Sequence, residues 1–422
     1  MTFLGITQKE SRWVKDQTKI RVDTEKGNKS RWMCELPSPK RMKAMYFDKT
    51  IALYMGDAKL IYETGLKSTC ALNIVMHVSI STHPSAYQFH DIIVLQNIGE
   101  FAVAKFRQTK LTSSYLFDAS LLYNLEIYRH LQLGGRHIQT SDKIDEMLQN
   151  TDISGKFPLK YFKLPYRNIY IECGETRNSP LRLYNKESGY HIFEGAYITE
   201  TSLDDVEYDI FYRNNFKTMD IVGSPNLENF RFFEFFLIGS PKEKTDLLDD
   251  CYFHTPILIP NDEHDIEKLI STQIEVIKSD NPNLKQDEMD CAISCIKHIA
   301  KVILFINTTS KELEEIDETS SIRKEVNRLP KSSSKRKTAQ TKLRYSSKKI
   351  FISLSGQEND QNSSNSERQN RNIKTHWRRG HFRHLKPMPP NRIQEKIIWI
   401  QPMLVNGMKS DELQEKEYIV TA

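Results

Sequence analysis

The stretch FRFFEFFLIG at residues 230–239 decides the fold, because it is the most hydrophobic strand-like segment of the chain. A run made up mainly of aromatic and aliphatic residues, without proline, is typical of a strand that is covered on both faces. We therefore predict a strand here, placed centrally in a sheet.

Other strand patterns lie on both sides of a predicted helix. Residues 111–133 have apolar residues at helical spacing, and Gly134 and Gly135 offer a natural stop. The short β-branched, aromatic or alternating runs lie at 75–80, 91–95, 101–106, 166–173, 182–184, 189–199 and 207–212. Residues 45–65 fit either a helix or a strand followed by a short helix.

The clearest helix follows this β-rich region. Residues 286–307 carry one apolar stripe, and acidic residues stand in the first turn, where the helix dipole favours them. Residues 44–307 are thus predicted to form one acidic α+β domain with a large, mainly antiparallel sheet and flanking helices.

Composition divides the rest of the chain. Residues 1–43 form a basic arm, and 308–347, rich in Ser, Lys, Glu and Thr, read as a linker or a frayed helix. A basic, aromatic β module is predicted at 348–407, in which 349–354 (KIFISL) would pair with two later strands. Its polar insertion at 355–372 is predicted to be disordered, and 408–422 form an acidic tail.

Charge is distributed unevenly although the net charge is only +5. Residues 44–330 carry 30 Lys/Arg against 42 Asp/Glu, whereas 331–400 carry 17 against 4. Such asymmetry favours contact with nucleic acid, a ribosome or an acidic protein surface. A merely solvated basic tail is the alternative.

The C-terminal module contains the most informative motif, KTHWRRGHFRH at 374–384, followed by KIIWIQP at 396–402. Cationic side chains could neutralise phosphates while aromatic rings stack on unpaired bases. The alternative is that the rings form a small core. The predicted binding residues are His376, Trp377, Arg378, Arg379, Gly380, His381, Phe382, Arg383 and Trp399.

The run HWRRGHFR followed by KIIWIQPxLVNG resembles the C-terminal signature of proteins carried by phages and plasmids, among them the type V-A anti-CRISPR family. Residues 164–172 (LPYRNIYIE) and 190–198 (YHIFEGAYI) are similar to further blocks of those proteins. The resemblance implies recognition of the emerging N-terminal peptide of a CRISPR effector nuclease and loss of its messenger RNA. A nascent polypeptide or the ribosome is then the expected partner, and RNA is a further one.

Signatures of catalysis are few. The chain has no Walker A, GxGxxG, GxSxG or HExxH motif. Glu172, Glu194 and Asp209 could gather around Mg²⁺ as in a nuclease acting on transcripts, and Glu194, between Phe193 and Gly195, would need a partner if buried. A nucleic-acid-binding accessory protein without a link to CRISPR is the third possibility.

A metal site is a weaker prediction. Cys291, Cys295 and His298 share one face of the predicted helix at 286–307, although such residues are more often plain core. We predict no cofactor, and we lean against an enzyme.

The sequence predicts a cytoplasmic protein without a membrane partner. The longest apolar run, at 299–306, is much shorter than the roughly 20 residues of a membrane span, and residues 1–12 lack the pattern of a secretory signal. The oligomeric state is left open.

Overall fold

The computed structural model describes the central and C-terminal parts of the chain together with a short N-terminal segment. The described residues are 36–41, 62, 119–153, 157–174, 179–185, 189–201, 231–241, 250–259, 266, 269–271, 274–275, 285–308, 313–346, 348–352, 376–390 and 392–405. The predicted strands at 75–80, 91–95, 101–106 and 207–212, the segment 45–65 apart from residue 62, the insertion at 355–372 and the tail at 408–422 lie outside them. No helix within the described residues is long and apolar enough to cross a membrane.

An eight-stranded mixed sheet forms the body, and the most hydrophobic stretch of the chain lies within it as strand β6. The strands follow the order β7-β6-β5-β3-β1-β9-β8, with β4 beside β5. Their bounds are β1 (Arg136–Thr140), β3 (Asn168–Glu172), β4 (Arg182–Asn185), β5 (Gly189–Thr201), β6 (Arg231–Ser240), β7 (Cys251–Ile259), β8 (Leu313–Asp317) and β9 (Lys348–Ile352). Among the described pairings of this sheet, only β1–β3 and β1–β9 are parallel. The predicted α+β class with a mainly antiparallel sheet is therefore confirmed.

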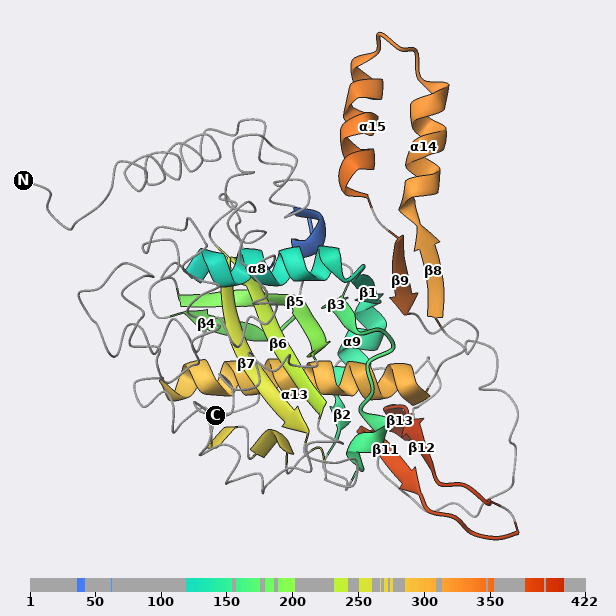
Figure 1. Cartoon of the computed structure of the whole chain (residues 1–422). Helices are drawn as coiled ribbons and strands as arrows, with labels where there is room; N and C mark the ends of the chain where they lie inside the picture. Colours follow the sequence, from blue (N-terminus) through green and yellow to red (C-terminus); the bar gives the residue numbers. More distant parts are fainter. Residues whose placement is uncertain are drawn as a thin grey trace, which may run out of the picture.

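Helices cover the two faces of this sheet (Figure 1). Helix α13 (Gln286–Thr308) lies across one face, with α9 (Asp142–Gln149) beside it, and α8 (Ala119–Gln132) lies across the other. Buried residues of α13 join those of β3, β5 and β6 in one continuous apolar core. The helix predicted at 286–307 is confirmed, and burial of its stripe against the sheet is what stabilises it.

The C-terminal strands pair only in part as the sequence suggested, since β11 (Gly380–Leu385) and β12 (Lys396–Ile400) lie side by side but residues 349–354 do not join them. Strand β9 lies in the main sheet, parallel to β1, and is not part of a C-terminal sheet. The three-stranded sheet there consists of β12 (Lys396–Ile400), β11 (Gly380–Leu385) and β2 (Thr151–Asp152). The pairing predicted for 349–354 was wrong because alternation defines the faces of a strand but not its neighbour.

Two shorter elements complete the C-terminal region. Strand β10 (His376–Arg378) pairs with β13 (Met403–Val405) in a separate antiparallel pair. A short 3-10 helix, η2 (Leu159–Tyr161), precedes β3 and places Leu159 in the main core.

The stretch that composition suggested to be a linker contains regular structure. After β8 the chain forms helix α14 (Glu318–Arg328), turns at Leu329–Ser333, and returns as α15 (Ser334–Tyr345) to β9. Figure 1 shows the two helices side by side, extending away from the rest of the described chain. Few apolar residues are needed to pair two helices, so the polar composition concealed this hairpin.

Candidate functional site

The two faces of the main sheet differ in chemistry. The face toward α13 is apolar, whereas the face toward α8 carries buried polar and ionisable side chains. We call the second one the polar face. Its buried polar or ionisable residues from the strands are His137, Gln139, Asn168, Tyr170, Glu172, Glu194, Tyr197, Thr199, Glu234 and Ser240. Burial of so many polar groups costs free energy unless each is paired, so this face is the candidate site.

The centre of the polar face is Glu194, which is 1% exposed. Its carboxylate accepts hydrogen bonds from the hydroxyls of Ser240 at 2.7 Å and Tyr170 at 3.1 Å, and it forms an ion pair of 3.1 Å with Nη2 of Arg41. Asp250 contacts the same Nη2 at 2.7 Å. The prediction that a buried Glu194 needs a partner is confirmed.

A β-bulge explains how strand β5 directs Glu194 to this position. Phe193 pairs with Gly239 and Gly195 pairs with the next residue, Ile238, so Glu194 is an extra residue in β5. A Cβ atom on Gly195 would lie 2.1 Å from the carbonyl oxygen of Ile171. Glycine is therefore required for β3 and β5 to pair beside the carboxylate.

The ligand of this carboxylate pair is a peptide segment of the chain itself, Leu36–Arg41, whose last four residues form a helical turn. The backbone N–H of Ser38 donates to Glu194, and its hydroxyl lies 2.8 Å from Tyr123 Oη and 2.9 Å from Tyr197 Oη. The Arg41 guanidinium is fully buried. A basic peptide is thus held through both its backbone and its side chains.

The charges around Arg41 favour its cationic form. Burial by itself would lower the pKa of Arg41, but the carboxylates of Asp250 and Glu194 outweigh burial, so that the pKa is raised. Burial also raises the pKa of Tyr123 and of Tyr197, which keeps both phenols neutral as hydrogen-bonding groups. The site is built to bind a cation among neutral hydroxyls.

A second ion-pair cluster lies between α8 and the same face. Arg129 contacts Glu126 on its own helix and Glu234 on β6, and all three side chains are buried. Thr199 donates to Glu126 at 3.2 Å. These charged contacts attach α8 to the sheet together with the stacking of Tyr123 on Phe236 of β6.

Two neutral histidines line this second cluster. Burial lowers the pKa of His130 and of His254 to about 4 in each case. Nε2 of His254 lies 3.7 Å from Glu234, and at neutral pH this contact joins a neutral ring to a carboxylate. Both rings therefore resist protonation in the folded protein.

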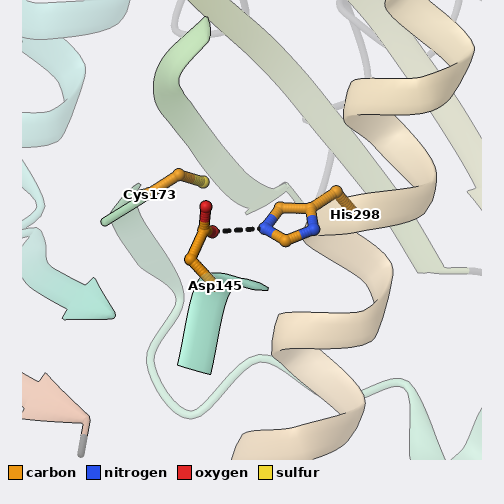
Figure 2. Close-up of side chains that lie close together, drawn as sticks. All are labelled: Asp145, Cys173 and His298. Atoms are coloured by element: carbon orange, nitrogen blue, oxygen red, sulfur yellow. Dashed lines mark hydrogen bonds and ion pairs between the residues drawn. The ribbon is translucent and has the colours of Figure 1, made fainter. Parts of the chain in front are cut away.

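One group within the described part of the chain could hold a metal ion, and it lies on the apolar side. Asp145 of α9, Cys173 after β3 and His298 of α13 offer ligand atoms that lie within 4.8 Å of one another (Figure 2). Carboxylate, thiolate and imidazole are zinc ligands. As the group stands, Asp145 accepts from His298 Nε2 at 2.6 Å and from Gln149 at 2.8 Å, and burial raises the pKa of the Cys173 thiol. A protonated thiol beside a fully hydrogen-bonded carboxylate forms a stable core contact by itself.

The metal ligands suggested by the sequence are not brought together. Only His298 of that set belongs to the group in Figure 2. Cys295 is buried and donates weakly to the carbonyl of Arg182 at 3.4 Å, and Cys291 is half-buried. Helical spacing put the three residues on one face, but their partners lie on different elements.

The acidic set suggested for a nuclease is divided between separate partners. Glu172 contacts His137 Nε2 at 2.8 Å, Glu194 contacts Arg41, and Asp209 lies outside the described residues. In the described part of the chain, Glu172 and Glu194 belong to no group that could hold a metal ion. Their carboxylates are engaged in buried pairs with cationic or imidazole side chains.

The C-terminal motif is divided between core and surface. Phe382 is 4% exposed and packs edge-on against Phe157, so its ring is not available for stacking on a base. Trp399 packs against Phe305 and donates to Thr151 at 3.3 Å.

The remaining motif residues differ in exposure. Gly380 is buried against Thr151 and Pro402, His381 is half-buried, and Arg379 and Arg383 are exposed. The side chains of His376, Trp377 and Arg378 lie outside the described residues.

Sequence reasoning missed Arg41, Asp250 and Asp145. Arg41 lies in a stretch of many cations and carries no pattern that marks it as buried. Asp145 belongs to α9, a helix of only eight residues that was not predicted. The apolar residue on each side of Glu194 was the only pattern that pointed to the site.

A family comparison agrees with the resemblance to the type V-A anti-CRISPR family. The model of the anti-CRISPR type V subtype A2 family, described as AcrVA2-like, matches residues 139–407, well over half of the 422 residues. The chain belongs to this family. A search of curated proteins finds no match.

The AcrVA2-like match includes Glu194, the group of Figure 2 and the α14–α15 hairpin. Arg41 and α8 precede it. The family therefore accounts for the sheet, while the peptide segment that occupies the polar face lies outside the matched residues.

Proposed function

We propose that this protein is an anti-CRISPR factor that lowers synthesis of a CRISPR effector nuclease by recognising the effector's nascent polypeptide. The observation that carries the proposal is the way in which the polar face holds Leu36–Arg41. Glu194 receives a backbone N–H from this segment, and Glu194 and Asp250 share its guanidinium. A face that binds one basic peptide in this manner is suited to bind another.

In this proposal the polar face binds a peptide through ion pairs and hydrogen bonds and does not catalyse a reaction. An arginine or lysine of the partner peptide would take the place of Arg41. The hydroxyls of Tyr123 and Tyr197, which contact Ser38 here, would form hydrogen bonds with the partner's backbone. The carboxylates would act as fixed acceptors rather than as a metal site. For the competing function, a metal-dependent nuclease, the suggested carboxylates Glu172 and Glu194 belong to no group among the described residues that could hold a metal ion.

The experiment separates peptide from RNA as the recognised molecule. Cells express this protein together with an effector gene whose first codons are either recoded synonymously or shifted in frame and restored downstream. Effector protein and transcript are then quantified.

We expect the effector protein and its transcript to decrease after synonymous recoding as they do with the unchanged gene. We expect no decrease when the frame shift changes the encoded peptide. Loss that follows the nucleotide sequence instead would contradict peptide recognition. An effector level that never falls would contradict the proposed function as a whole.

A further inference from the structure

The α14–α15 hairpin is strongly basic. Residues 318–346 contain nine Lys/Arg against two Asp/Glu. Eight of the nine cations have exposed side chains, namely Arg323, Lys324, Arg328, Lys331, Lys335, Lys337, Lys342 and Arg344. None of the eight forms an ion pair with a described residue.

The hairpin does not need these cations in order to fold. Val326 and Ala339 are buried between the helices, and Arg336 donates to the carbonyl of Leu329 at 2.8 Å to close the turn. At its base, Glu318 contacts Lys40 and Lys349. Of the two acidic residues, Glu318 is thus used for attachment, and eight of the nine cations are left at the surface.

The charge pattern opposes the stability of α15. Its first turn contains Lys335, Arg336 and Lys337 and no acidic residue, although the positive end of the helix dipole lies there. The N-cap residue, Ser333, makes no side-chain cap hydrogen bond. Folding alone does not explain why a chain would keep this arrangement.

The hairpin's chemistry fits a nucleic-acid backbone rather than unpaired bases. Stacking on successive unpaired bases requires several exposed aromatic rings, and residues 318–346 contain a single aromatic residue, Tyr345, at the end of α15. Helices of 11 and 12 residues span about 17 Å, enough to contact several phosphates along a duplex. Duplex RNA is recognised largely through its shape and its backbone.

We propose that the α14–α15 hairpin binds double-stranded RNA through contacts of its exposed Lys and Arg side chains with the phosphates of the RNA backbone. The choice of RNA rather than DNA rests on the proposed function, in which the protein acts during translation. This site is separate from the C-terminal motif, where Arg379 and Arg383 are exposed but Phe382 belongs to the core.

The test measures binding of the full chain to a 20-base-pair RNA stem by fluorescence anisotropy at several salt concentrations. The variant carries Lys335→Gln, Lys337→Gln, Lys342→Gln and Arg344→Gln. The control carries Arg379→Gln and Arg383→Gln, two exposed cations outside the hairpin. Melting curves are recorded for all three proteins.

We expect the hairpin variant to bind at least about tenfold more weakly at 0.1 M salt. Each lost phosphate contact lowers the slope of log K against log salt by about one, so the slope should fall by about two to four. The control should lose less than about threefold, and the melting temperature of the hairpin variant should not fall.

Three results would overturn the proposal. The hairpin variant could bind with the affinity of the unchanged protein, the control could lose as much as the variant, or single-stranded RNA or a DNA duplex could bind as tightly as the RNA stem. None of these results bears on the proposed function, which is judged by effector levels in cells without added RNA.

Discussion

At the residue scale, the polar face depends on Arg41 and the two carboxylates that share it. Each of these side chains comes from a different part of the chain, so the cluster exists only in the folded protein. A buried ion pair of this kind is costly to break, because the remaining partner stays buried without compensation.

Glu194→Gln should destabilise the protein by roughly 3 kcal/mol, because Arg41 then keeps only Asp250 as a buried counter-charge. The measurement is urea unfolding at neutral pH. Glu315→Gln is the matched control, since this glutamate is 54% exposed in its contact with Lys348 and should change stability by less than about 0.5 kcal/mol. Equal stability of the two variants would show that the buried pair is not what holds the segment.

At the element scale, β5 combines a strand pattern with one irregularity. The bulge at Glu194 requires β3 to approach Gly195 closely, and this approach positions the carboxylate beside the Tyr170 hydroxyl. The strand pattern of 189–199 was visible in the sequence, but the extra residue was not.

Gly195→Ala should destabilise the fold by roughly 2–3 kcal/mol, because its Cβ would meet the backbone oxygen of Ile171, which is fixed in the sheet. Gly134→Ala is the comparison, since Gly134 has a φ of 62° but open space around it. This substitution should lower the free energy of unfolding by about 1 kcal/mol. Thermal unfolding of both variants measures the difference. A milder effect at Gly195 than at Gly134 would contradict the bulge.

At the scale of the whole molecule, one short segment contacts both the polar face and the α14–α15 hairpin. Arg41 enters the polar face beside β5, while Lys40, the preceding residue, contacts Glu318 at the base of the hairpin. The hairpin continues from β8, the strand at the opposite edge of the sheet from β7. One short segment thus contacts both the proposed peptide site and the proposed RNA site.

The buried histidines make the stability of the whole protein dependent on pH. His130 and His254 have a pKa of about 4 when folded, lowered from 6.5, so below pH 6.5 the unfolded chain binds protons that the folded chain does not. The free energy of unfolding is therefore highest, with respect to these two histidines, above pH 6.5. It falls as the pH decreases toward 4, by up to about 1.4 kcal/mol per pH unit for each histidine.

The variant His254→Gln should therefore show a flatter loss of stability between pH 6.5 and 5 than the unchanged protein. Urea unfolding at pH 7.5, 6 and 5 measures the slopes. Identical slopes would mean that His254 becomes protonated in the folded state as readily as in the unfolded chain.

The sequence by itself determined the α+β class, the central strands, the helix α13 and the resemblance to an anti-CRISPR family. These depend on local periodicity and on short motifs, which each segment carries independently of the others. The same local information showed that Glu194 required a partner, and it placed an excess of cations after residue 330.

Only the tertiary structure decided which residues meet. It paired β9 with β1, joined Arg41 to Glu194 across more than 150 residues, placed Phe382 in the core, and arranged part of the polar 308–347 stretch as a hairpin. Long-range pairing is set by the burial of complementary surfaces across the whole molecule, and a period of two or of 3.6 residues contains no information about the partner.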